Sequence, residues 1–275
     1  MSAKGGSVVV TIINNKGGTG KTTTSVNLGA ALSKLGYRIL LIDMDPQASA
    51  SFSLGVGREE LSPGLADVMF DSVPVVDAVH RTSVPRLHLL TGEMELANSD
   101  LILGEEDDGR FRLKRTLHAV RGNYDFVLCD CPPSLSLLPV NALTASDAFI
   151  VTMLPEYLAY EGLIGLMEMV SAVKNGLSVN PVLLGILFTM VSTASRLRQE
   201  YKTGLEVIQK VREQYGETVF RRIIRRDPVL SEAPSAGQSV FDFRPGTRGA
   251  KEYRFLVAEF LERCGIDGRE AIKRL

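Results

Sequence analysis

The amino-acid sequence predicts an α/β fold with one mostly parallel, twisted sheet and helices on both of its faces. Short apolar runs alternate with helical patterns along the whole chain. The runs are continuously apolar, which indicates strands buried on both faces and therefore a parallel sheet. A glycine-rich turn follows the first run directly and precedes a helical pattern. We expect one domain over residues 1–275, with a loose tail at residues 1–6.

Each element is predicted from its own pattern. The first helix, residues 24–35, carries Leu28 and Leu32 on one face and is followed by Gly36, a common helix terminator. Similar patterns predict helices at residues 161–174, 203–214 and 252–263. The expected strands are the apolar runs at residues 8–13, 38–43, 87–90, 126–130, 148–154 and 182–188, and a last one formed by 219–220 with 223–224.

Composition narrows the class of protein. The formal net charge is −1 and 45% of the residues are hydrophobic, which is ordinary for a globular protein and excludes binding to nucleic acid through an overall basic charge. No apolar run approaches the roughly 20 residues of a membrane span. The three cysteines lack the spacing of a zinc site. We therefore expect a cytoplasmic protein whose cysteines stay reduced.

The turn after the first strand has the sequence of a phosphate-binding loop, Lys16-Gly17-Gly18-Thr19-Gly20-Lys21-Thr22-Thr23. Its glycines let backbone N–H groups turn toward phosphate oxygens. We expect Lys21 to neutralise the β- and γ-phosphates of a nucleotide and the Thr22 hydroxyl to ligate Mg²⁺. The loop is a variant of G-x-x-x-x-G-K-[ST], because Asn15 stands at the first glycine and Lys16 is an additional lysine.

Acidic residues end two of the expected strands. Asp43 and Asp45 follow the second strand, and Asp130 closes the run at 126–130. Ligands of parallel α/β sheets bind outside the carboxyl ends of the strands, so these carboxylates suit a magnesium ion and an attacking water. A turn around Pro46 and a solvated strand end are the alternative interpretations. The phosphate loop upstream favours the functional interpretation in both cases.

A local concentration of arginine contrasts with the neutral composition. Residues 221–226 read Arg-Arg-Ile-Ile-Arg-Arg, and Arg196, Arg198 and Lys202 would extend the patch. A solvated face accounts for such a run about as well as contact with a DNA backbone does. Both interpretations stay open on the residues alone.

The combination of motifs resembles the ParA/Soj-type partition ATPases, members of the deviant Walker A family that also includes MinD. The resemblance covers nearly the whole chain. It rests on the K-G-G-x-G-K-T-T loop, the D-x-D-P-Q and D-x-P-P-S strand ends, the Glu156-Tyr157 pair, and L-S-E-A-P-S at residues 230–235. The chain departs from the family where I-P-R-N is common, because it has Ile224-Arg225-Arg226-Asp227, and where an arginine often stands it has Val229.

The resemblance implies a role for each matching residue. Lys16 would be the signature lysine, which reaches the partner's nucleotide in an ATP-bound homodimer, and Gly17 would stay small at the approach of the two chains. Lys21, Thr22 and Thr23 match positions at the phosphates and Mg²⁺, Asp45 matches a water-positioning carboxylate, and Asp43 and Asp130 lie around the metal. The remaining loop residues and the expected adenine side would complete the nucleotide contacts: Gly18, Thr19, Gly20, Arg225 and Arg226.

The resemblance also implies partners. The ATP-bound dimer is expected to bind nonspecific DNA over the nucleoid, through Arg196, Arg198, Arg222, Arg225 and Arg226, and a ParB-like protein is expected to stimulate a slow hydrolysis. The loop lies so near the start that no N-terminal DNA-binding extension is expected. A MinD-like, membrane-associated ATPase is the alternative, but the helix at 252–263 carries three glutamates and apolar residues that suit core packing. A metabolic enzyme with the same loop is a third possibility.

Overall fold

A computed structural model describes residues 6–192, 198–269, 273 and 275. The described residues form a seven-stranded sheet in the order β3-β4-β2-β5-β1-β6-β7. All neighbouring strands are parallel except β3 and β4, which are antiparallel. The strands are β1 (Val8–Ile13), β2 (Ile39–Asp43), β3 (Val79–Arg81), β4 (Leu87–Leu90), β5 (Phe126–Asp130), β6 (Ala148–Met153) and β7 (Val182–Phe188).

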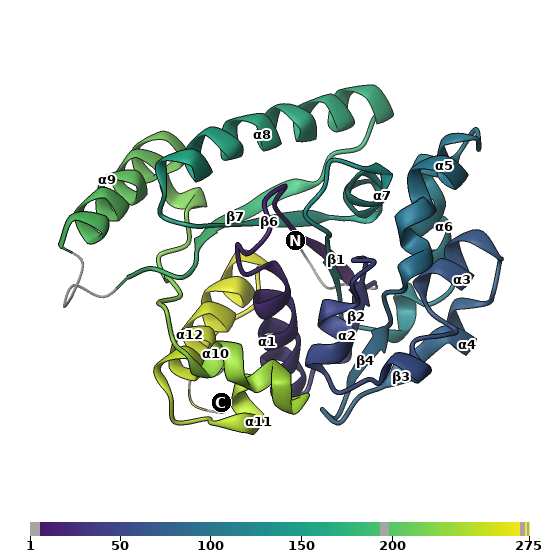
Figure 1. Cartoon of the computed structure of the whole chain (residues 1–275), viewed down its shortest axis with the longest axis horizontal. Coiled ribbons are helices and arrows are strands. Elements are labelled where there is room, and N and C mark those ends of the chain that lie inside the picture. The colour runs from purple at the N-terminus through teal and green to yellow at the C-terminus, as the bar shows by residue number, and fades with distance from the viewer. Residues whose placement is uncertain (1–5, 193–197, 270–272, 274) are drawn as a thin grey trace.

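Helices cover both faces of the sheet, as the sequence predicts (Figure 1). Along β1, Val9 and Ile13 enter the core on one face, and Val10 and Ile12 enter the core on the other. The helices are α1 (Lys21–Lys34), α2 (Ser49–Ser53), α3 (Leu65–Phe70), α4 (Val75–Ala78), α5 (Ser99–Gly104), α6 (Arg112–His118), α7 (Leu137–Ala145), α8 (Tyr157–Leu177), α9 (Arg198–Tyr215), α10 (Val229–Glu232), α11 (Val240–Phe243) and α12 (Arg248–Arg263).

Each face has its own set of helices. Helices α1, α11 and α12 bury apolar residues against one face, whereas α3, α6, α7 and α8 pack on the other. In Figure 1, α8 lies above the sheet and α1 and α12 lie below it. The central strands are completely buried, which explains why they read as continuous apolar runs. No helix among the described residues is long and apolar enough to cross a bilayer.

Two expectations about elements were wrong or incomplete. No strand forms at residues 219–224. Val219 and, just after this segment, Arg225 make only isolated bridges, to Ile186 and Val191. The edge strand β3 and the short helices α2 to α7 carry patterns too brief to predict. The expected tail lies almost entirely outside the described residues, and Arg196 lies outside them as well.

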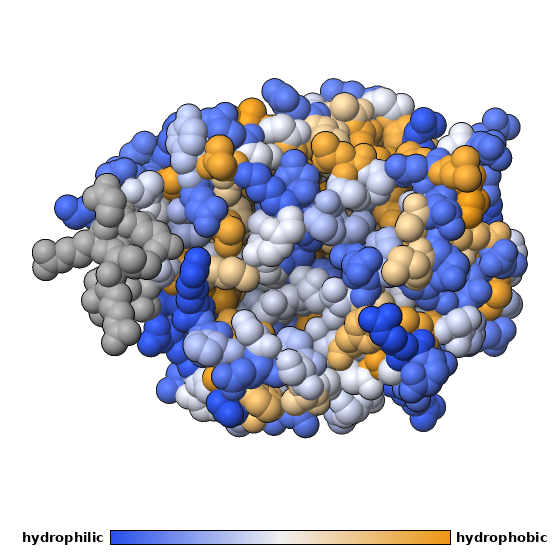
Figure 2. Space-filling model, in the orientation of Figure 1, coloured by the Kyte–Doolittle hydropathy of each residue, from blue (hydrophilic) through white to orange (hydrophobic). Residues whose placement is uncertain are grey.

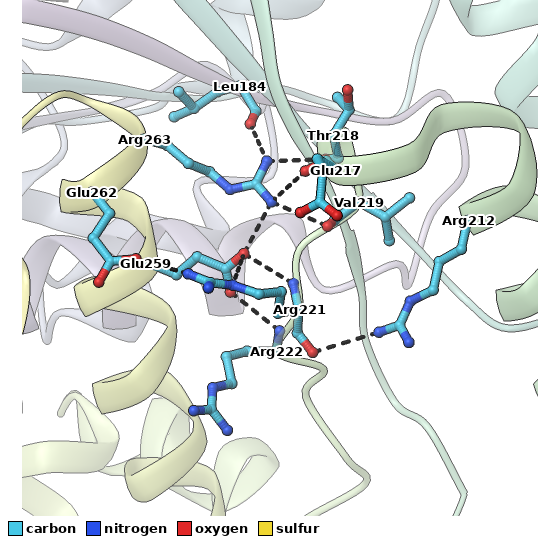
Figure 3. A network of polar contacts seen from close by, with 10 residues as sticks. All are labelled: Leu184, Arg212, Glu217, Thr218, Val219, Arg221, Arg222, Glu259, Glu262 and Arg263. Carbon is cyan, nitrogen blue, oxygen red and sulfur yellow. Dashed lines mark hydrogen bonds and ion pairs between the residues drawn. The ribbon is translucent and has the colours of Figure 1, made fainter.

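The guanidinium of Arg263 binds the carbonyl groups that lead into this segment. It donates to the carbonyl oxygens of Glu217, Thr218 and Val219 at 2.8, 3.1 and 3.0 Å, and to that of Leu184 on β7 at 2.7 Å (Figure 3). It also pairs with the buried carboxylate of Glu259 at 2.9 Å, one turn earlier in α12. Arg263 therefore satisfies the carbonyl groups at the start of the segment. The segment itself bonds to β7 at separate points, where the N–H groups of Phe220 and Ile224 donate to the carbonyl oxygens of Ile186 and Phe188 at 2.9 and 2.8 Å.

Glu259 holds the same segment from its other side. Its carboxylate oxygens accept the backbone N–H groups of Arg221 and Arg222 at 2.9 and 3.2 Å (Figure 3). The last turns of α12 thereby fix the chain just before it reaches residues 224–228. Glu259 and Arg263 therefore help to position residues 224–228.

Arg263→Ala should lower the free energy of unfolding by about 3 kcal/mol, because it removes several hydrogen bonds and the close partner of a buried carboxylate. Arg115→Ala is the matched control, since its pair with Asp108 is exposed and should contribute less than about 0.5 kcal/mol. Urea unfolding of both variants measures the difference. Equal losses in the two variants would contradict the role assigned to Arg263.

Candidate nucleotide site

The phosphate loop connects β1 to α1 at the carboxyl end of the sheet. Gly18 and Gly20 have φ angles of +70° and +79°, a region that favours glycine. Gly20 directly precedes α1, so the first N–H groups of that helix, from Lys21 onward, face the loop without helical partners. A turn of this shape at a helix N-terminus is suited to binding a phosphate group.

Side chains from neighbouring strands hold the loop in place. Asn14 donates to the carbonyl oxygen of Thr152 at 2.6 Å and accepts the N–H of Lys16 at 2.9 Å. The hydroxyl of Thr189 donates to the carbonyl oxygen of Thr19 at 2.8 Å. The sequence analysis missed Asn14, Thr152 and Thr189. Their only signal was a polar residue in or beside an apolar run, which does not identify a partner far along the chain.

The two lysines of the loop lie in different surroundings. Lys21 is buried and its ammonium donates to the carbonyl oxygen of Lys16 at 2.8 Å. Burial lowers the pKa of Lys21, while the nearby Asp130 opposes that shift. The Lys16 ammonium instead donates to the carbonyl oxygen of Leu158, in the first turn of α8. One lysine thus lies inside the loop and the other lies on its outer side.

The acidic strand ends lie together beside the loop, as expected for ends of adjacent parallel strands. Asp43 and Asp130 are paired in the register of β2 and β5, and both side chains are completely buried. The hydroxyls of Thr22 and Ser25 donate to Asp130 at 2.7 and 2.8 Å. Asp43 accepts the N–H and hydroxyl of Ser51, both at 2.8 Å. These hydroxyls tie the two carboxylates to α1 and α2.

The electrostatics of this pair fit a cation. Burial raises the pKa of Asp43 to about 6, and burial with the neighbouring Asp43 charge raises the pKa of Asp130 to about 7. Both values are high because two carboxylates share a dry site. Oxygen donors from Asp43, Asp130 and Thr22 are the kind that Mg²⁺ prefers. A bound divalent ion would relieve the repulsion, so the residues present suit magnesium.

Asp45 lies at the start of the turn into α2 and is partly exposed. Its carboxylate accepts the N–H of Gln47 at 2.9 Å, and its own N–H donates to Asp43 at 3.2 Å. Both the turn and the functional interpretation of Asp45 are therefore compatible with its position. The carboxylate lies near Lys21, and its negative charge opposes the lowering of the pKa of that lysine.

A pocket of about 400 Å³ continues from the loop toward α10 and α12. Gly20 and Thr23 form its end nearest the phosphate loop, and Tyr253 of α12 and Met190 contribute apolar walls. Residues 224–228 form another wall, which includes Arg225 and Arg226. The sequence placed these two arginines near the base of a nucleotide, and the structure brings them to a cavity next to the loop.

Three arginines of the run contact side chains of α12. Arg221 pairs with Glu262 at 2.7 Å, and the guanidinium of Arg222 lies 4.5 Å from the centre of the Phe255 ring. Arg225 pairs with Glu252 at 2.6 Å. Arg198 is the first residue of α9. The charge of the run is therefore partly balanced by glutamates of α12.

The free energy of unfolding of the protein without nucleotide or magnesium should decrease as the pH rises from about 4 to about 7. Burial raises the pKa of Glu93 to about 7, and Asp43 and Asp130 shift the same way, so the folded state binds more protons in this window. The contribution of these three groups to the free energy of unfolding is complete below the ordinary carboxyl pKa and is lost as the pH rises through 6 to 7.

Glu93→Gln, which keeps that group neutral, should make the pH dependence shallower by at most about 1.4 kcal/mol per pH unit. Urea unfolding at about pH 5.5, 6.5 and 7.5 checks both expectations. A stability that increases over this range in the wild type would contradict them.

Comparisons with known proteins show the family of this chain. The family described as "AAA domain" matches residues 7–183. The sporulation initiation inhibitor protein Soj of Bacillus subtilis is 39% identical over 91% of this chain and 97% of its own. The chromosome partitioning protein ParA of Caulobacter vibrioides is 39% identical over 93% of this chain and 94% of its own.

Among solved structures, the cobyrinic acid a,c-diamide synthase of Mycobacterium smegmatis with bound ATP analogue and magnesium is 30% identical. Its TM-score is 0.81, and the match covers 96% of this chain and 97% of that one. The identity to Soj and ParA extends over nearly the full length of both chains, well beyond the loop motif. The protein therefore belongs to the Soj/ParA family of chromosome-partitioning proteins.

Proposed function

We propose that this chain is an ATP-dependent switch: it binds ATP with Mg²⁺, forms a homodimer, binds nonspecific DNA as the dimer, and releases it on hydrolysis. The observation that carries the proposal is that the two lysines of the loop lie in different positions. Lys21 lies inside the loop, whereas Lys16 lies on its outer side against α8. A lysine in that outer position is available to the nucleotide of a second copy.

The nucleotide contacts follow from the geometry around the loop. The free N–H groups at the start of α1 and the ammonium of Lys21 would bind the phosphates, and the pocket lined by Met190 and Tyr253 would receive the base. Thr22, Asp43 and Asp130 would hold Mg²⁺, which supplies positive charge against the phosphate oxygens. Asp45, at the turn beside them, would orient the attacking water.

The surface beside Lys16 supports a dimer. Gly17 is exposed, and a Cβ at this position would meet nothing within 4 Å, so no contact within the chain requires glycine there. Leu135 and Leu158 are 63% and 69% exposed. Figure 2 shows apolar residues gathered over α5 and α7 on the face in view. A second copy would cover apolar surface of this kind.

DNA and a stimulating partner complete the proposed cycle. Six basic residues line a second pocket, of about 370 Å³, which would accept DNA phosphates: Arg212, Arg221, Arg222, Arg225, Arg248 and Lys251. A ParB-like protein bound to cargo would accelerate hydrolysis, and repeated cycles over the nucleoid would position that cargo. The apolar residues of α12 are buried on α1 and the sheet, which favours DNA over a membrane as the surface bound.

Binding to duplex DNA with ATP, with ADP and without nucleotide, over a series of salt concentrations, tests the proposal. We expect tight binding with ATP only and a steep decrease of the association constant with salt. Binding that is independent of nucleotide would contradict it. ATP-dependent sedimentation with vesicles in place of DNA would instead support the membrane alternative, and turnover only with an acid acceptor would support a metabolic ligase.

Lys16→Ala should abolish ATP-dependent dimerisation while the monomer keeps its affinity for nucleotide, because the side chain of this lysine lies on the outer side of its own loop. Sedimentation velocity with ATP measures the first and binding of a fluorescent ATP analogue measures the second. Lys34→Ala, at the far end of α1, is the control and should dimerise normally. If Lys16→Ala sediments with ATP as the wild type does, Lys16 is not required for dimerisation and its assigned role is wrong.

Asp45→Ala should slow hydrolysis by about 10²-fold or more and trap the ATP dimer on DNA, since it removes a group next to the attacking water and leaves the loop intact. Phosphate release and DNA retention after dilution measure the two effects. Asp107→Ala changes an exposed aspartate in a loop and should leave both unchanged. Normal turnover in Asp45→Ala would exclude Asp45 from catalysis.

A further inference from the structure

Arg225 lies in a wall that is shared by two pockets. It lines the pocket of about 400 Å³ next to the phosphate loop, and it also lines the basic pocket of about 370 Å³ on the other side of the arginine run. Of the described residues that line the two pockets, it is the one that both share. Its charge can therefore act on a ligand in either one.

Glu252 of α12 holds Arg225 at two points. One carboxylate oxygen accepts the backbone N–H of Arg225 at 2.7 Å, and the other accepts its guanidinium at 2.6 Å. The Glu252 side chain is 11% exposed, whereas that of Arg225 is 45% exposed. The glutamate thus fixes both the chain and the side chain of Arg225 from the interior, and it neutralises a charge that would otherwise face solvent.

Tyr253, the next residue of α12, reaches the nucleotide side. It lines the pocket next to the loop, and its hydroxyl lies 3.2 Å from that of Thr24, in the first turns of α1. Helix α12 therefore contacts α1 through Tyr253 and binds Arg225, in the shared wall, through the preceding residue, Glu252. The two contacts join the two pockets through a rigid element.

We propose that Glu252 is a positioning residue that couples the two pockets. The ion pair with Glu252 keeps the guanidinium of Arg225 from binding phosphate groups in the basic pocket. A nucleotide in the other pocket weakens this ion pair through the wall that the two pockets share. The inference rests on the proposed function, in which those phosphate groups belong to DNA. Glu252 would thus increase the difference in DNA affinity between the ATP-bound and nucleotide-free states.

Glu252→Gln separates the two contacts. The amide oxygen of glutamine can still accept the backbone N–H of Arg225, but its NH₂ group faces a guanidinium that has only donors. The guanidinium is therefore released while the chain stays in place. Nucleotide-free DNA binding should strengthen about 3- to 10-fold, and the slope of log K against log salt should steepen by about one. The ratio of ATP-bound to nucleotide-free affinity should fall by the same 3- to 10-fold.

Glu262→Gln is the matched control. Glu262 lies on the same helix, carries the same charge and pairs with Arg221, which lines the basic pocket but not the nucleotide pocket. This variant should strengthen DNA binding equally in both nucleotide states and leave their ratio unchanged. A ratio that falls equally in both variants would show a general effect of charge and would overturn the proposal.

The same measurements in an Arg225→Ala background form a double-mutant cycle. Glu252→Gln should have no effect on the affinity ratio there, because its target is gone; an effect that persists would overturn the proposal. A wild type whose DNA affinity is the same with and without ATP would overturn the proposed function itself. An ATP-dependent wild type whose ratio survives in Glu252→Gln would overturn only the role of Glu252.

Discussion

The structure depends on the burial of two carboxylates side by side at the ends of β2 and β5. Asp43 and Asp130 are completely buried, and their charges repel in a dry environment. The hydroxyls of Thr22, Ser25 and Ser51 stabilise the carboxylates and tie them to α1 and α2. The phosphate loop lies next to this pair. A cation held by the carboxylates and a phosphate group held by the loop would therefore balance each other's charge.

Helix α12 organises the opposite side of the site. Its glutamates bind the segment after β7: Glu259 accepts two backbone N–H groups, and Glu252 accepts the backbone and side chain of Arg225. Arg263 satisfies the carbonyl groups of the same segment. A chain of nearly neutral net charge thereby carries a concentrated group of arginines in a defined position, because Arg221, Arg222 and Arg225 are each placed by an acidic or aromatic neighbour on α12.

Local sequence was sufficient where a pattern reports burial directly. The strands at 87–90, 126–130 and 182–188 were predicted with their observed ends, since a strand buried on both faces must be apolar throughout. The same reasoning failed at 219–224. The apolar residues there pack on the core, but their backbone bonds to β7 only at separate points, through Phe220 and Ile224, and Arg263 takes the carbonyl group of Val219. A pattern of hydrophobicity shows that residues are buried but does not show which groups bond their backbone.

The sequence by itself determined the phosphate loop, the parallel sheet and the acidic strand ends, because each depends on neighbours along the chain or on a rule common to all parallel sheets. Only the tertiary structure decided which residues meet across it. Thr189 bonds to the loop from the residue after β7, the ammonium of Lys16 bonds to α8, and Glu252 holds Arg225. These contacts join residues far apart in the chain, and their partners follow from how helices pack on the sheet, which no local pattern records.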